Sequence, residues 1–322
     1  MQYRRLGRSG LQLSALSYGA WVNFGRGVGR GEARELIACA WDHGINFFDN
    51  AEGYGQGEAE RIMGDALADL RLPRDGWCVS SKVFFGAAAE PRPTQRGLSR
   101  KHVVEACHAA LRRLRVEHLD LYYCHRPDPD TPVAETVAAM DLLVRQGKVL
   151  YWGTSEWPAE LIEEAFAIAA ATGQAAPSME QPQYNLFERA RVEREYAPLT
   201  ARHGLGLTTW SPLASGLLSG KYGGNGGGRL DAPEFAWLDN HTSGGLGQRR
   251  VSAVGRLAPI AADLDCTLAQ LAIAWCLGNQ DVSSVILGAS RVAQLQENLG
   301  ALAVAGRLDP ATRARMDAAV AG

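Results

Sequence analysis

The chain has 322 residues, a formal net charge of -2 and apolar side chains at 46% of its positions. A charge so close to zero gives no electrostatic footprint for nucleic acid or for an anionic membrane surface. No run approaches the roughly 18 apolar residues of a membrane span, and the N-terminal segment MQYRRLGRSG lacks the apolar stretch of a secretory signal. We therefore expect a cytoplasmic protein with no membrane span and no nucleic-acid partner.

The six cysteines are scattered along the chain and form no Cys-x-x-Cys pair. This pattern favours free, buried thiols in a reducing compartment. Two cysteines precede a histidine, at Cys107-His108 and Cys124-His125. Adjacent residues rarely bind one metal ion together, so no metal site is predicted.

Strand-like and helix-like segments alternate along the chain. Residues 3–16 come first and predict a small hairpin around Arg8, Ser9 and Gly10. Short apolar runs typical of buried strands follow at residues 15–21, 45–49, 77–83, 119–125, 149–155, 178–183, 205–212 and 283–288.

Amphipathic helices are predicted between most of these runs. The segment 32–44 ends on a glycine suited to a C-cap. The segment 99–114 opens on Ser99, a good N-cap, and 158–173 has a proline in its first turn. One more helix is expected at 309–319.

Alternation of this kind predicts a parallel sheet with right-handed crossovers. Eight strand-helix units fit an α/β fold of the closed (β/α)8, or TIM, barrel type, and a doubly wound open sheet is the alternative. The hairpin would cover the bottom of such a barrel. We expect residues 1–322 to form a single domain.

Polar side chains stand at the ends of three consecutive strands. Asp49 ends the second strand, with Tyr54 in the following loop, while Lys82 ends the third and His125 the fourth. Each residue alone has an ordinary structural interpretation as a turn former, a solvated lysine or a hydrogen-bonded histidine. The carboxyl ends of barrel strands meet at one mouth, where active sites lie, so the four together predict a catalytic group.

This group suits the reduction of a carbonyl. A proton donor must stand near the developing alkoxide, and a tyrosine with its usual pKa of about 10 responds poorly near neutral pH. An ammonium such as that of Lys82 favours tyrosinate and lowers the pKa, and Asp49 is a partner for the ammonium. His125 can orient the carbonyl oxygen. The hydride must come from a cofactor.

At these residues the sequence resembles the aldo-keto reductases. It is most similar to the branch that contains the voltage-gated potassium channel β subunits and their bacterial relatives. The segments that carry the resemblance are YRRLGRSGLQLSAL, GINFFDNAEGYG, GLSRKHV, DLYYCHRPDPDTPVAET, GKVLYWGTSEW, QPQYNLFER, TWSPLASGLLSGKY and VILGASRVAQLQENL, from residue 3 to about residue 300.

The resemblance implies roles for individual residues. Tyr54 is expected to be the general acid, Lys82 and Asp49 to tune it, and His125 to place the carbonyl. Trp21 and Phe85 are expected to wall the substrate pocket together with Tyr54 and His125.

The resemblance also implies NADPH/NADP+ as cofactor. Trp210 is expected to stack on the nicotinamide, and Ser155 and Gln181 to bond its carboxamide. Further cofactor contacts are expected at Ala20, Trp21, Asp49, His125, Glu156, Ser211, Pro212, Leu213, Ala214, Ser215, Lys221, Arg229, Gly288, Ser290, Arg291, Gln294, Glu297 and Asn298.

A preference for NADPH over NADH is predicted from the adenosine end of this set. Arg291 starts the segment that would cradle the adenosine, and no acidic residue lies between Gly288 and Gln296. A phosphate on the ribose needs cationic groups, whereas an acidic residue suits a free hydroxyl.

We predict an enzyme that reduces small aldehydes or ketones. One alternative is a redox-sensing, cofactor-binding subunit of a membrane protein. By this resemblance, the channel subunits have asparagine where this chain has His125. The histidine therefore argues against the subunit alternative. Another alternative, a sugar isomerase or aldolase on the same barrel, would use Lys82 as a Schiff base. The sequence does not determine the physiological substrate, the direction of reaction or the oligomeric state, and a homo-oligomer is one of the possible states.

Overall fold

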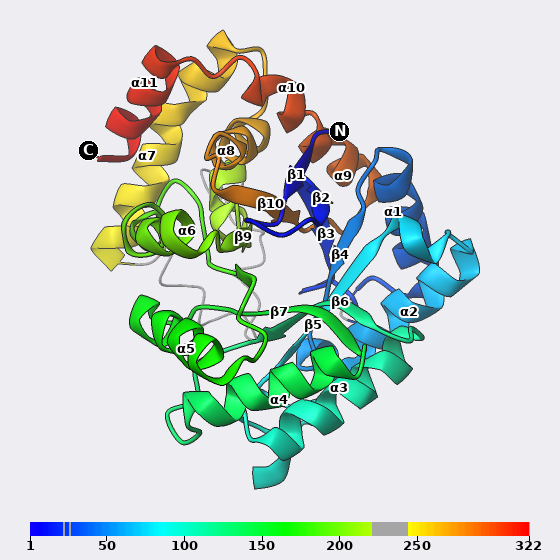
Figure 1. The fold of residues 1–322 in the computed structure, drawn as a ribbon. Helices are drawn as coiled ribbons and strands as arrows, with labels where there is room; N and C mark the ends of the chain where they lie inside the picture. Colours follow the sequence, from blue (N-terminus) through cyan, green and yellow to red (C-terminus); the bar gives the residue numbers. More distant parts are fainter. Residues whose placement is uncertain (22, 26, 221–243, 322) are drawn as a thin grey trace.

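The computed structural model describes residues 1–21, 23–25, 27–220 and 244–321. In these residues, eight parallel strands close into a barrel in the order β10-β3-β4-β5-β6-β7-β8-β9. Helices surround the strands (Figure 1), which confirms the predicted (β/α)8 barrel. The barrel strands are β3 (Leu16–Gly19), β4 (Phe47–Asp49), β5 (Cys78–Val83), β6 (Leu119–Cys124), β7 (Val149–Thr154), β8 (Met179–Glu180), β9 (Gly206–Thr209) and β10 (Val282–Leu287).

The strands lie at the predicted runs, but the sixth and seventh are clearly shorter than their runs. The sixth run, 178–183, contains only the two-residue strand β8. Pro182 lies in the second half of the run and has no backbone N–H to donate to a ladder. β5 continues one residue past Lys82, and β6 ends one residue before His125.

Two of the predicted helix ends lie at the expected capping residues, whereas Pro158 is the N-cap residue of its helix and does not lie in the first turn. Ser99 caps α3, accepting a hydrogen bond from the backbone N–H of His102, and Gly173 ends α5 in the left-handed conformation with φ +65°. The helices between the strands are α1 (Arg30–Asp42), α2 (Glu58–Leu70), α3 (Arg100–Leu114), α4 (Val133–Arg145), α5 (Ala159–Thr172), α6 (Ala197–His203), α7 (Gly244–Asp263) and α8 (Leu268–Leu277). After β10 come α9 (Val292–Leu299), α10 (Ala301–Ala305) and α11 (Pro310–Ala321).

The predicted N-terminal hairpin is present and closes one end of the barrel. Its strands β1 (Tyr3–Arg5) and β2 (Gln12–Ser14) pair antiparallel. Leu6 and Leu13 from the hairpin are fully buried and pack with Phe47 and Leu121 in an apolar cluster. The hairpin thereby keeps water from the amino ends of the strands.

Side chains in a strand alternate between the two faces of a sheet, and this period separates the core from the site. Phe47 and Leu121 belong to the cluster at the hairpin end. Two residues further along the same faces stand Asp49 and Tyr123, of which Tyr123 still belongs to that cluster, and two residues beyond Tyr123 stands His125. Polar side chains such as Asp49 and His125 therefore lie beyond the apolar cluster, at the carboxyl ends of the strands.

The chain after β9 adds helices at one side of the barrel. α11 packs beside α7 (Figure 1), where Arg256 Nε donates to the carbonyl of Ala319 over 2.9 Å. No single helix in the described residues is long and apolar enough to cross a membrane. Only α7 and α8 taken together reach that measure, and they are bent by 87°.

Candidate active site

A cavity of about 710 Å³ opens at the carboxyl ends of the barrel strands. Asp49, Tyr54 and His125 line one part of it, and residues from the loop after β9 and from α9 line the rest. The volume is in the range of small-molecule and cofactor sites. The strand-end residues singled out in the sequence therefore share one site.

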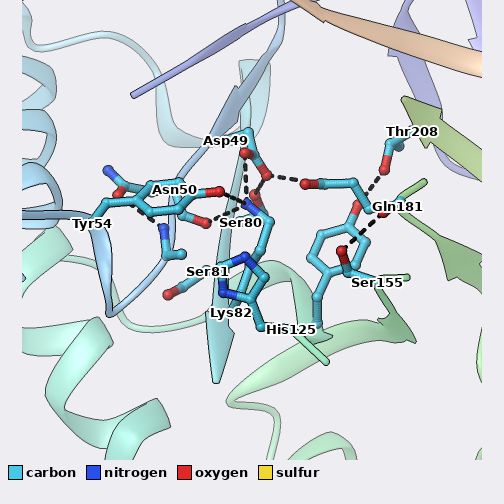
Figure 2. Close-up of polar contacts among 12 residues, drawn as sticks. Asp49, Asn50, Tyr54, Ser80, Ser81, Lys82, His125, Ser155, Gln181 and Thr208 are labelled. Carbon is cyan, nitrogen blue, oxygen red and sulfur yellow. Dashed lines mark hydrogen bonds and ion pairs between the residues drawn. The ribbon is translucent and has the colours of Figure 1, made fainter. Parts of the chain in front are cut away.

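Lys82 lies at the centre of a buried polar cluster (Figure 2). Its ammonium donates to Asp49 Oδ2 over 2.7 Å, to the backbone oxygen of Asn50 over 2.9 Å and to the Tyr54 hydroxyl over 3.2 Å. Each of the three ammonium hydrogens thus has an acceptor, so the charge of Lys82 is fixed in position behind Tyr54.

The carboxylate of Asp49 is held from several strands. Its Oδ1 accepts hydrogen bonds from Ser80 Oγ over 2.7 Å and from Gln181 Nε2 over 3.0 Å. Oδ2 takes the bond from Lys82. With both oxygens occupied, Asp49 orients Lys82 and has little freedom to move.

A short loop presents Tyr54 to the cavity. Tyr54 starts a turn, Tyr54–Gly57, in which Gly55, Gln56 and Gly57 have φ of 55°, 58° and 85°. Glycine adopts such left-handed conformations without steric cost. The turn bends the chain back into α2 and leaves the hydroxyl next to Lys82.

The ionisation of Tyr54 differs from the sequence expectation. Burial raises the pKa of Tyr54 well above its ordinary value, the charge of Asp49 raises it further, and Arg126 opposes the shift. The net shift is therefore upward, opposite to the lowering that was expected from Lys82. Tyr54 keeps its proton at neutral pH, which is the form that a general acid requires.

His125 stands beside Tyr54 as a neutral ring. Burial lowers its pKa well below the ordinary value, and the charges of Lys82 and Arg126 add to this effect. Its ring centroid lies 5.7 Å from that of Tyr54 and 5.1 Å from that of Phe85. Within the described residues its side chain makes no hydrogen bond, so the ring is available to a ligand.

Trp210 is fixed at the wall of the cavity. Its Nε1 donates to Glu156 Oε1 over 3.0 Å, and Glu156 in turn pairs with Arg191. Trp21 meets the Trp210 ring edge-on at 5.4 Å between centroids. Glu156 itself, with φ +59°, does not line the cavity and acts by holding Trp210.

The loop after β9 has several residues in a left-handed conformation. Ser211, Ala214 and Ser215 have φ of 57°, 47° and 59°. The backbone here winds in a tight turn, and Ser211 Oγ accepts a hydrogen bond from the Ser215 backbone N–H over 3.2 Å. Ser211, Pro212, Leu213 and Ser215 line the cavity, whereas Ala214 is buried behind them.

Another part of the cavity is formed by residues 288–298, which lead into α9 and continue along it. Arg291 is the N-cap residue of this helix. Asn298 is buried, yet its Nδ2 has no hydrogen-bond partner in the described residues. A buried amide without a partner is costly, so this end suits a ligand that accepts a hydrogen bond. The other lining residues predicted from the sequence here are Gly288, Ser290, Gln294 and Glu297.

Most of the remaining predicted residues also line the cavity, namely Trp21, Phe85, Ser155, Gln181 and Trp210. Ala20 and Lys82 do not line it, because both are fully buried behind the surface. Ala20 instead donates its backbone N–H to the carbonyl of Asp49 over 2.9 Å. Lys221 and Arg229 lie outside the described residues.

Among the lining residues that the sequence analysis missed are Asn23 and Arg126. Arg126 directly follows His125, so extending the strand-end argument by one residue would have found it. Asn23 donates from Nδ2 to the carbonyl of Ala289 over 3.0 Å, a contact between distant segments that no local pattern indicates.

The described residues contain no group of three or more His, Cys, Asp or Glu side chains that could hold a metal ion. All six cysteines are present as free thiols, and five of them are buried.

Comparison with known proteins adds to this geometry. A family model described as "Aldo/keto reductase family" matches residues 15–321. A protein of Arabidopsis thaliana described as "Probable voltage-gated potassium channel subunit beta" is 50% identical over 315 residues, which cover 96% of this chain and 94% of that protein. A protein of Oryza sativa subsp. japonica with the same description is 48% identical over 323 residues, covering 99% and 97%. These matches agree with the family and branch that the motifs indicated.

Proposed function

Because the chain belongs to the aldo/keto reductase family, we propose that it is an NADPH-dependent reductase of small aldehydes or ketones. The observation that carries the proposal is the position of the Lys82 ammonium, 2.7 Å from Asp49 and 3.2 Å from the Tyr54 hydroxyl at one end of the cavity. This arrangement would serve proton transfer, whereas well-packed apolar side chains in its place are often equally stable.

In the proposed reaction, Tyr54 donates its proton to the carbonyl oxygen of the substrate. Lys82 stabilises the tyrosinate that develops, and Asp49 keeps Lys82 charged and in place. The neutral His125 ring hydrogen-bonds the carbonyl oxygen and orients it toward Tyr54. Trp21 and Phe85 exclude water from the substrate side.

The cavity fits a dinucleotide that supplies the hydride. Trp210, held by Glu156, lines the same cavity as His125 and offers an apolar ring to a ligand. At α9, Asn298 offers an Nδ2 donor that has no partner among the described residues, and Arg291 offers a positive charge at the cavity lining. We propose that the nicotinamide lies at Trp210 and the adenosine at α9, with the ribose phosphate near Arg291.

A panel of small aldehydes and ketones, followed by the loss of NADPH absorbance, tests the proposal. We expect turnover with aldehydes in the wild type and almost none in Tyr54→Phe. Trapping with borohydride separates this function from an aldolase, because a Schiff base on Lys82 would leave a stable adduct.

A second candidate function follows from the relatives' descriptions as probable potassium channel β subunits. The chain would then bind a membrane channel and report the redox state of its cofactor. A pull-down from membranes that depends on bound cofactor would support this function.

We further propose that residues 1–322 form one functional unit in the cytoplasm.

A further inference from the structure

Arg126 brings a positive charge to the catalytic end of the cavity. It follows His125 directly, is partly buried and lines the same cavity as Tyr54. Its guanidinium carbon lies 5.8 Å from the centroid of the Phe85 ring, which walls the same region. The charge therefore faces the space where the substrate would lie.

Within the described residues, one nitrogen of the guanidinium makes hydrogen bonds to the protein. Arg126 Nη1 donates to the His125 carbonyl and, over 3.4 Å, to Ser155 Oγ. Nε and Nη2 make no hydrogen bond to the described residues. These two nitrogens form the edge of a guanidinium that binds a carboxylate with two parallel hydrogen bonds.

No acidic side chain of the described residues pairs with Arg126. Asp49 is occupied by Lys82, and Glu156 by Arg191 and Trp210. Asp128, two residues further along, accepts hydrogen bonds from the Leu98 backbone and from Thr131. His125 is neutral and Lys82 is matched by Asp49, so Arg126 is the positive charge at the catalytic end that no acidic side chain of the described residues compensates.

We propose that Arg126 is a specificity residue that selects substrates with a carboxylate near the reacting carbonyl. The inference rests on the proposed reductase function and names its substrate class. The free Nε–Nη2 edge would hold the carboxylate while Tyr54 and His125 meet the carbonyl. A neutral aldehyde of the same length would leave that edge without a partner.

The test compares matched aldehydes with and without the carboxylate: 4-oxobutanoate against butanal, and 5-oxopentanoate against pentanal. The measurement is kcat/KM with NADPH for each. We expect the wild type to favour at least one of the two acids over its neutral match by about 10-fold or more. Arg126→Gln should lower this ratio by about 10- to 100-fold, as for the loss of a hydrogen bond to a charged group.

Two variants serve as controls. Arg126→Lys keeps the charge but loses the two-pronged geometry, so it should retain part of the preference. Arg34→Gln removes an exposed arginine on α1, away from the cavity, and should leave the ratio as in the wild type.

The possible failures are distinguishable. If the wild type reduces neither kind of aldehyde, the proposed function falls and the inference with it. If the wild type reduces butanal and pentanal with the same kcat/KM as 4-oxobutanoate and 5-oxopentanoate, only the inference is overturned. If Arg126→Gln slows acids and neutral aldehydes equally, Arg126 acts on the reacting carbonyl, and its role in selecting carboxylates is refuted.

Discussion

Lys82 and Asp49 form an ion pair of 2.7 Å in which the side chains are only 0% and 3% exposed. Removing one partner of such a pair leaves the other buried and uncompensated, which costs about 3–5 kcal/mol. Lys82→Met should therefore lower the free energy of unfolding by about that amount and should also slow reduction.

The double variant Lys82→Met/Asp49→Asn separates stability from catalysis. The asparagine keeps a carbonyl oxygen for Ser80 and Gln181 and removes the unpaired charge. We expect urea unfolding to show that much of the lost stability returns while the activity does not. Recovery of activity in the double variant would show that the ammonium is dispensable for Tyr54.

His125 should act as a neutral hydrogen-bonding group. Burial lowers its pKa well below the ordinary value of about 6.5, so the ring is uncharged at and above that pH. The rate of reduction should therefore show no histidine titration above about pH 6.5. His125→Asn should slow turnover about 10-fold or more and leave cofactor binding intact, because an amide donor replaces the ring imperfectly. Wild-type turnover in this variant would remove His125 from the mechanism.

The cofactor preference should depend on Arg291. Arg291→Ala should weaken NADPH binding by about 1–3 kcal/mol, the range for a charge-assisted hydrogen bond, and should barely change NADH binding. Arg307→Ala, which removes an exposed arginine outside the cavity, is the matched control. Titration of both cofactors by fluorescence would check this, and equal weakening of the two would reject the phosphate site.

A buried carboxyl outside the catalytic cluster should make stability depend on pH. Burial raises the pKa of Glu180 to about 8, Glu156 adds to the shift, and the hydrogen bond with Thr154 opposes it. Because the pKa is raised in the folded protein, the stabilising contribution is complete below the unfolded pKa of about 4.5 and is lost as the pH rises through about 8.

Glu180→Gln tests this dependence. The wild-type free energy of unfolding should fall between about pH 5 and 9 by an amount on the order of 1–4 kcal/mol from this group. The glutamine variant stays neutral, so its curve should be flatter and cross above the wild type at high pH. Parallel curves for the two proteins would mean that Glu180 does not titrate in this range.

The barrel could be predicted from the sequence because its signals are local and repeated. Apolar runs such as 45–49 end at a polar residue, and Ser99 and Gly173 mark helix ends by their own chemistry. β8 is shorter than its apolar run because Pro182 interrupts the ladder, and the pattern of hydrophobic residues does not carry that information.

Within the site, the residues at strand ends were predictable and the electrostatics were not. The topology of a barrel brings Asp49, Lys82 and His125 together whatever lies between them. The pKa of Tyr54 depends on how deeply its hydroxyl is buried and on distances to charges from other segments. Arg126 directly follows a strand end, but only the packing shows that its Nε and Nη2 make no hydrogen bond to the described residues.

The most direct measurement of the central claim is the rate of NADPH-dependent aldehyde reduction by Tyr54→Phe, with cofactor affinity measured on the same samples. The substitution removes the proton donor and leaves the ring in place. We predict a loss of about 10²- to 10⁴-fold in kcat with nearly unchanged NADPH binding. A turnover close to that of the wild type would contradict the assignment of Tyr54 as the general acid.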